Sequence, residues 1–279
     1  MVRHEDVFGH TTVILDKLNE NIYSTEKLNQ TVLDISYPCT WVILHDKSVD
    51  SCIGVGFGSV KLMAYEGPFE WKDGDDGDSA FQTVQGHYLD WAKSYDQLTS
   101  MTGWTGPSKV ADVTAGCFTP EQRDCVRILD VGAGTGLVAK ELSKRGFRHI
   151  DALDPSEAML SEAKKVGVYE NYIIDFLSSD SPTSIPDNSY DALTGSGIFA
   201  GGHVPCEALH EMIRLVKPGG FVVLVVSDQF LSVSEPYKLL EPMMDKLEFD
   251  RKWKKISSEV FPNYYGVDSG RVWCFKICK

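Results

Sequence analysis

The chain has 279 residues, of which 43% are hydrophobic and 24% charged. This composition is typical of a globular protein with one large core, or one core and a small appendage. The formal net charge is −13 at pH 7, so the chain has no global attraction for phosphate backbones. Nucleic acid is therefore a disfavoured partner, whereas a small molecule or a basic protein segment is compatible with the charge.

The seven cysteines are scattered and form no Cys-x-x-Cys pair, which favours neither a disulfide framework nor a zinc site. The first ten residues include His4, Glu5 and Asp6, where a signal peptide would need an apolar run. No stretch approaches the roughly 18 consecutive apolar residues of a membrane span. We therefore expect reduced thiols, a cytoplasmic or nuclear location, no membrane partner and no metal.

Composition divides the chain into an N-terminal extension at 1–64, an acidic, glycine-rich linker at 65–79 and a main domain at 80–279. Within the extension, a possible helix at 11–21 precedes two β-like runs, 40–44 and 53–63, which predict a hairpin. These runs faintly resemble the central hairpin of small N-acetyltransferase domains, but the loop that would bind acyl-CoA is missing. A β-rich appendage, either a remnant or a functional module, is expected.

From residue 80 onward, β-like runs alternate with helical patterns, which predicts an α/β fold with a mostly parallel sheet. The expected strands are 127–131, 149–153, 171–176, 190–194 and 221–226. The expected helices are 83–94, 135–145, 156–166, one that begins at Pro205, and 237–247. Residues 252–259 and 271–277 are expected to form a closing antiparallel hairpin.

The strongest functional signal is ILDVGAGTG at 128–136, where an apolar run leads directly into a glycine-rich turn and a helical pattern. Glycine permits positive φ and lets a ligand rest against the main chain, while the helix start offers unpaired amides. Leu137 stands where the third glycine of a dinucleotide-binding loop would be. A glycine turn without any ligand is the alternative.

Asp154 follows the second expected strand of the main domain, 18 residues beyond Gly136. A carboxylate at this place can accept hydrogen bonds from both ribose hydroxyls of an adenosine ligand. The sequence Asp154-Pro155-Ser156-Glu157 also has the form of a capping box. Asp154 could therefore cap the next helix instead, and the two roles could coexist.

Four segments follow one another in the order ILDVGAGTG, LDPSEAML, IPDNSYDAL and LHEMIRLVKPGGFVVLVV. Together they resemble the ordered motifs of class I S-adenosylmethionine-dependent methyltransferases, over residues 80–279. The finer matches WAKSYDQ, GTGLVAKEL and AGGHVPCEALHEM make the chain similar to the methyltransferase-like family of the Williams–Beuren syndrome chromosomal region. The resemblance implies a Rossmann-like sheet of seven strands with an antiparallel last strand, and S-adenosyl-L-methionine as cofactor.

The resemblance also implies which residues hold the cofactor. Those for the methionine part and ribose are Asp130, Gly132, Ala133, Gly134, Thr135 and Gly136, and those for the ribose hydroxyls are Asp154, Pro155 and Ser156. Asp175 and Phe176 would hold the adenine. Gly195 and Ser196 would lie at the sulfonium end, and Tyr95 and Asp96 would close over the cofactor. Asp175 could instead be a solvated loop carboxylate, and Tyr95 and Asp96 a packing aromatic and a surface charge.

Methyl transfer from a sulfonium is an in-line displacement, so the protein must mainly align the reactants and exclude water. A base is needed only where the acceptor must lose a proton. His203 and Glu207 are the candidates, although His203 could be a structural residue before a helix, and Cys206 is expected to pack. Thr194-Gly195-Ser196-Gly197 differs from the Asp/Asn-Pro-Pro-Tyr/Phe segment that accompanies amino methylation of adenine or cytosine in nucleic acids.

We therefore expect an enzyme that transfers a methyl group to a small molecule or a protein. Two alternatives belong to other functional classes. The first is a catalytically silent protein that binds S-adenosylmethionine as a scaffold. The second is a nicotinamide-dependent oxidoreductase, which Leu137 disfavours.

Overall fold

The structure is a computed structural model of the chain, and it describes residues 2–7, 10–16, 41–46, 51–55, 63–66, 86, 88–89, 92–93, 95–101, 103–178, 181–200, 203–228, 231, 235–265 and 268–279. The chain divides into two compact units, Met1–Asp73 and Gly74–Lys279. The domain boundaries expected from composition remain predictions, because most of the expected linker lies outside the described residues. In the part of the chain described here, no helix is long and apolar enough to cross a membrane.

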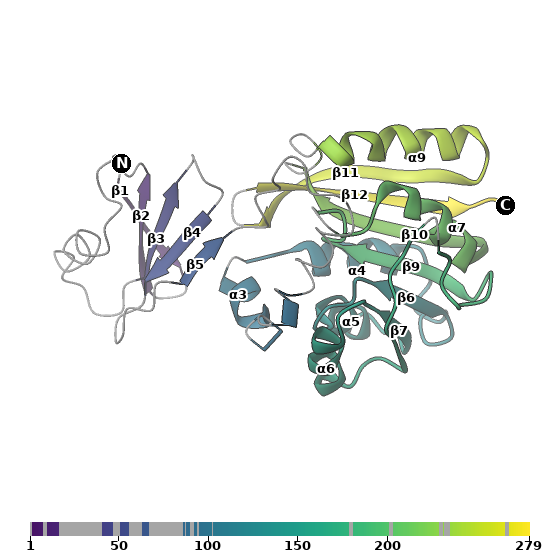
Figure 1. Ribbon diagram of the computed structural model, residues 1–279, viewed down its shortest axis with the longest axis horizontal. Helices are drawn as coiled ribbons and strands as arrows, with labels where there is room; N and C mark the ends of the chain where they lie inside the picture. The colour runs from purple at the N-terminus through teal and green to yellow at the C-terminus, as the bar shows by residue number, and fades with distance from the viewer. Residues whose placement is uncertain are drawn as a thin grey trace. The chain divides into compact units, whose positions relative to one another are not determined.

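The first unit contains a five-stranded sheet in the order β1-β2-β3-β4-β5 (Figure 1). The strands are β1 (Val2–Val7), β2 (His10–Asp16), β3 (Trp41–Asp46), β4 (Ser51–Val55) and β5 (Met63–Glu66). β3 and β4 pair antiparallel, as the expected hairpin requires. The helix expected at 11–21 is wrong over 11–16, because the run Thr11 to Leu15 is rich in β-branched residues that favour a strand.

The second unit contains a seven-stranded sheet in the order β11-β12-β10-β9-β6-β7-β8 (Figure 1). The strands are β6 (Arg127–Val131), β7 (His149–Leu153), β8 (Asn171–Ile173), β9 (Tyr190–Ser196), β10 (Val216–Ser227), β11 (Trp253–Tyr265) and β12 (Asp268–Ile277). The strands from β10 to β8 pair in parallel, whereas β12 pairs antiparallel with β10 and β11. The predicted Rossmann-like α/β fold is confirmed.

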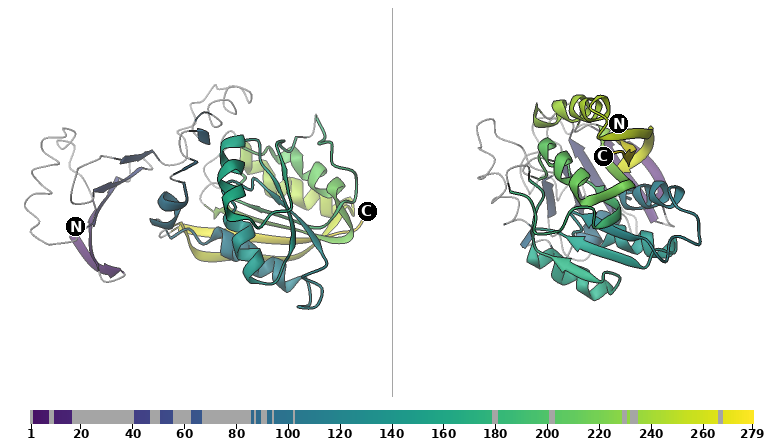
Figure 2. Two further views of the ribbon diagram at one scale, coloured as in Figure 1. Left: turned by 90° about the horizontal axis from the view of Figure 1, so that it is seen from below. Right: turned by 90° about the vertical axis from the view of Figure 1, so that its right-hand side faces the viewer.

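Helices cover both faces of this sheet (Figure 2). The helices are α3 (Tyr95–Met101), α4 (Gly106–Gly116), α5 (Leu137–Lys144), α6 (Glu157–Val166), α7 (Leu209–Leu215) and α9 (Leu240–Phe249), with 3-10 turns η1 (Cys206–Ala208) and η2 (Glu235–Leu239). Buried side chains of α4, α5 and α6 pack with Ile128 and Ile150 on one face. Those of α7 and α9 pack with Leu129 and Leu193 on the other. The side chains of successive residues in one strand, which point to opposite faces of the sheet, thus pack in different hydrophobic cores.

The structure differs from the predicted elements mainly at their ends. β6 and β7 have the predicted bounds, but β8 ends at Ile173, so the strand expected at 171–176 is too long. The helix expected from Pro205 begins as the 3-10 turn η1, and Val216 already belongs to β10. The helix expected at 83–94 lies largely outside the described residues. α4 was not predicted at all.

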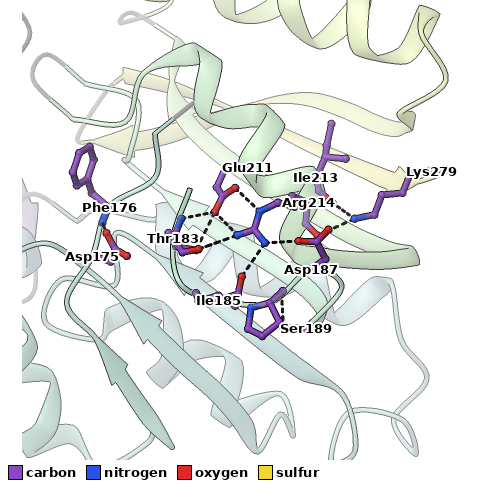
Figure 3. Close-up of polar contacts among 11 residues, drawn as sticks. Asp175, Phe176, Thr183, Ile185, Asp187, Ser189, Glu211, Ile213, Arg214 and Lys279 are labelled. Carbon is purple, nitrogen blue, oxygen red and sulfur yellow. Dashed lines mark hydrogen bonds and ion pairs between the residues drawn. The ribbon is translucent and has the colours of Figure 1, made fainter. Parts of the chain in front are cut away.

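A polar network fastens the segment between β8 and β9 to α7 (Figure 3). Arg214 of α7 donates to the carboxylates of Glu211 (2.7 Å) and Asp187 (2.5 Å) and to the Ile185 carbonyl (2.9 Å). Glu211 is only 5% exposed and also accepts from the N–H and hydroxyl of Thr183, both at 2.9 Å. Burial alone would raise the pKa of Glu211, but hydrogen bonds from Arg214 and Thr183 lower it below its ordinary value.

We expect Arg214→Leu to lower the free energy of unfolding by about 3 kcal/mol, because it leaves the buried Glu211 carboxylate without its cation. Urea denaturation followed by far-ultraviolet circular dichroism measures the change. Lys246→Leu is the matched control, because Lys246 forms an exposed pair with Asp250 (2.6 Å), and it should cost about 0.5 kcal/mol or less. Equal losses in the two variants would contradict a structural role for the network.

Candidate active site

The turn between β6 and α5 runs through backbone conformations that favour glycine. Gly132 and Gly134 have φ of 61° and 52°, in the left-handed region where side chains are strained. A Cβ on Gly132 would also lie 2.5 Å from Cγ2 of Ile198. The segment therefore needs glycine, and it presents bare main chain at the start of α5, as the sequence predicted.

Asp154 joins this turn to the next one. Its Oδ2 accepts the Gly134 N–H and its Oδ1 accepts the Ser156 N–H, each at 2.8 Å. Burial raises the pKa of Asp154 to about 6, and the two backbone hydrogen bonds limit the rise. Ser156, whose hydroxyl accepts the Met159 N–H at 3.4 Å, is the N-cap of α6. The interpretation of Asp154 as the cap is therefore wrong.

Asp130 lies inside the protein, on β6. Its carboxylate accepts the hydroxyl of Tyr169 at 2.5 Å and that of Thr194 at 3.1 Å. Burial raises the pKa of Asp130 to about 7, even though these hydrogen bonds oppose the rise. The ring of Tyr169 also packs against Gly136, so Asp130 and Tyr169 support the glycine turn from within.

A pocket lies at the carboxyl ends of β6, β7 and β9. Ligands of open α/β sheets bind at this edge. Its walls are mainly apolar and aromatic. The lining residues are Tyr88, Tyr95, Trp104, Val131, Gly132, Ala133, Gly134, Thr135, Leu137, Val138, Leu153, Asp154, Pro155, Met159, Phe176, Leu177, Ser196, Gly197, Ile198, His203 and Val204.

The pocket brings together ten of the predicted site residues. These are Tyr95, Gly132, Ala133, Gly134, Thr135, Asp154, Pro155, Phe176, Ser196 and His203. The others do not line it, and these are Asp96, Asp130, Gly136, Ser156, Asp175, Gly195 and the second candidate base, Glu207. Asp175 is half-buried and accepts the Phe176 N–H at 2.9 Å (Figure 3), and Cys206 is buried as expected. The roles assigned to individual residues remain predictions.

Tyr88 and Trp104 line the pocket but were not singled out from the sequence. The Tyr88 hydroxyl lies 2.7 Å from Nε2 of His203, and the two rings meet edge to face. Burial and the nearby charge of Asp154 raise the pKa of Tyr88 above its ordinary value, so its hydroxyl keeps its proton at neutral pH. No motif or spacing in the sequence pointed to either residue.

Asp96 fastens α3 to the glycine turn. Its carboxylate contacts the hydroxyl of Thr135 and pairs with Nζ of Lys140 at 2.8 Å. Tyr95, the first residue of α3, lines the pocket and meets Tyr88 edge to face. The role of Asp96 toward a cofactor remains a prediction, because its side chain is 43% exposed and does not line the pocket.

The pocket meets two tests for an adenosyl sulfonium ligand. Its glycine turn offers main chain without Cβ atoms, and Asp154 places a carboxylate at the tip of the neighbouring strand. Trp104 and Ser196, which also line the pocket, lie beside the buried Tyr264: burial raises the pKa of Tyr264, and its hydrogen bonds with Trp104 and Ser196 limit the rise.

Comparison with known proteins agrees with this geometry. A family model described as "Methyltransferase domain" matches residues 129–224. Methyltransferase-like protein 27 of Homo sapiens is 35% identical over 175 residues, which cover 61% of this chain and 68% of that protein. Demethylmenaquinone methyltransferase of Renibacterium salmoninarum is 42% identical over 100 residues, or 35% of this chain and 40% of that protein.

A solved structure shares the fold at low sequence identity. It is that of the Burkholderia thailandensis 1,6-didemethyltoxoflavin-N1-methyltransferase with bound 1,6-didemethyltoxoflavin and S-adenosylhomocysteine. Its TM-score is 0.53 at 13% identity, covering 84% of this chain and 99% of that chain. The chain belongs to the class I S-adenosylmethionine-dependent methyltransferases and is an enzyme of that family.

The raised pKa of the Asp130 carboxyl predicts that the folded protein loses stability as the pH rises. Its pKa is 3.8 ordinarily and about 7 in the folded protein, so the folded state binds the extra proton between these values. The stabilisation from this proton is complete below pH 4 and disappears as the pH rises through 7.

The side chain of Asp130→Asn stays neutral at every pH. The free energy of unfolding of this variant should therefore exceed that of the wild type by about 2 to 4 kcal/mol at pH 8 and should be similar to it near pH 4. Urea denaturation at several pH values measures this difference. Asp250→Asn, at an exposed carboxylate, should follow the wild-type curve. Parallel curves for Asp130→Asn and wild type would contradict the raised pKa.

Proposed function

We propose that the pocket binds S-adenosyl-L-methionine and that a small, neutral acceptor receives its methyl group at the same place. The bound cofactor supplies a methyl group on a positively charged sulfur, which a nucleophile can take in one in-line displacement. The main chain at 132–136 holds the methionine part, and Ser196 lies at the sulfonium end. The observation that carries this proposal is that the glycine turn, Asp154 and the Tyr88–His203 pair line one pocket.

Asp154 is suited to the ribose although both its oxygens already accept backbone hydrogen bonds. Each carboxylate oxygen has two acceptor sites, so each can take a ribose hydroxyl as well. Pro155, Met159 and Leu177 form an apolar slot for the adenine beside Phe176, which is 40% exposed. Stacking on an aromatic ring would bury that exposed face.

The charges of the lining residues favour a neutral acceptor. Among the described lining residues, Asp154 is the only acid, His203 is the only titratable base, and none is lysine or arginine. A phosphorylated or carboxylate acceptor would need such cations. The relative from Renibacterium salmoninarum is named for demethylmenaquinone. We infer a small molecule with an apolar or aromatic body, and we keep nucleic acid as a disfavoured acceptor.

Tyr88 and His203 can remove a proton from this acceptor. Nε2 of neutral His203 accepts the Tyr88 hydroxyl proton while the phenolic oxygen takes a proton from an O–H or N–H of the acceptor. The acceptor then presents its lone pair as the methyl group transfers. The five described cysteines form no disulfide, and a cytoplasmic location is part of the same proposal.

Asp154→Ala should weaken binding of S-adenosylmethionine and S-adenosylhomocysteine at least about tenfold, because the ribose loses its acceptors. Wild-type affinity should also fall as the pH drops through about 6 and Asp154 takes up a proton. Isothermal titration calorimetry measures both effects, with folding checked by circular dichroism. Asp250→Ala is the control and should bind as the wild type does. Unchanged affinity in Asp154→Ala would refute the assignment.

Tyr88→Phe and His203→Gln should each slow methyl transfer by about 10²-fold or more, because the proton relay is broken. Their affinity for S-adenosylhomocysteine should change by less than about threefold. The assay follows labelled methyl from S-adenosylmethionine into the small-molecule filtrate of a cell extract. His210→Gln, at an exposed histidine of α7, is the matched control. Wild-type rates in Tyr88→Phe would rule out the relay and leave His203 as a structural residue.

A further inference from the structure

Two cysteines that lie 157 residues apart in the sequence meet in the second unit. Sγ of Cys117 lies 3.4 Å from Sγ of Cys274. A disulfide has an S–S length of about 2.05 Å, so bond formation requires the sulfurs to approach by roughly 1.4 Å. None of the five described cysteines, which also include Cys125, Cys206 and Cys278, is in a disulfide. Neither residue of this pair lines the pocket.

The two sulfurs differ in accessibility. Cys117 is the C-cap residue of α4 and is half-buried. Cys274 is 2% exposed, in the interior of β12, where it pairs with Val223 of β10 and Ser257 of β11. A hydrogen bond from the Cys274 thiol lowers the pKa of Cys117, whereas the same contact and burial raise that of Cys274. The accessible sulfur is therefore the one that more readily becomes a thiolate.

We propose that Cys117 and Cys274 are a reversible oxidation site that closes to a disulfide when the enzyme meets a peroxide. The Cys117 thiolate attacks one peroxide oxygen, the O–O bond breaks, and the second oxygen leaves as hydroxide to become water. The resulting sulfenic acid is attacked by the Cys274 sulfur, which forms the S–S bond, loses its proton and releases a second water. Two thiols lose two electrons and two protons, and hydrogen peroxide becomes two molecules of water.

The bond would join α4 to the sheet at the end of the helix away from the pocket. Trp104, which lines the pocket, precedes the first turn of α4, whereas Cys117 follows its last turn. Closure over so long a loop restricts the unfolded chain strongly. The expected consequence is a rise in Tm of about 5 °C or more, with little change in cofactor binding.

The test treats the full-length protein with increasing hydrogen peroxide and then alkylates the remaining thiols. Intact mass should decrease by two hydrogen atoms, and peptide mapping should identify one cross-link, between Cys117 and Cys274. Dithiothreitol should restore both thiols and the original Tm. The exposed thiols of Cys125 and Cys278 provide an internal comparison, because they lack a described sulfur neighbour and should oxidise without forming this cross-link.

Cys117→Ser and Cys274→Ser should each abolish the cross-link, whereas Cys125→Ser should leave it unchanged. In Cys274→Ser the sulfenic acid of Cys117 should persist and react with dimedone. Should the buried substitution prevent folding, Cys117→Ser alone decides the question, because its site is half-buried. The proposal is overturned if both thiols stay reduced at peroxide concentrations that oxidise Cys125, or if the cross-link maps to other cysteines.

Discussion

The hydrogen bond from the Gly134 N–H to the carboxylate of Asp154 holds the site together. It joins the turn after β6 to the turn after β7, so bare main chain and a carboxylate are fixed in one geometry before any ligand arrives. Asp130 and Tyr169 support the same turn from the interior, and Asp96 holds Thr135 from α3. These bonds come from different segments of the chain, so the conformation of the turn depends on several parts of the fold.

The same arrangement places two carboxylates where burial makes ionisation costly. Asp130 and Asp154 have pKa values raised to about 7 and about 6, so at neutral pH their charge opposes folding. On the proposed function, a cationic ligand in the pocket would lower both pKa values and recover part of this free energy. Ligand binding and stability are then linked through the same two side chains.

The sequence predicts best where local and tertiary preferences agree. β6 and β7 match to the residue because their apolar runs are buried on both faces, and α6 has a clear stop at Gly167, which takes a left-handed conformation. α4 escaped prediction because glycines flank a short run with two valines and a threonine, so packing of Val110 and Ala111 decides its structure. Asp154 also fits a cap position in the sequence, because spacing alone cannot distinguish it from Ser156, which is the N-cap of α6.

The residues on the two sides of the pocket differ in how well the sequence predicts them, and the spacing of the segments that carry them explains the difference. The proposed cofactor side is built by consecutive βα turns, whose spacing is fixed by the strands and helices that they connect. The proposed acceptor side is built by Tyr88, Trp104 and His203, which come from segments before the first core strand and after β9. No helical or strand period relates these three residues, so only the folded chain brings them together. Different segments at these places could select a different acceptor without a change in the glycine turn. The sequence motifs therefore indicate the methyl donor but not the acceptor.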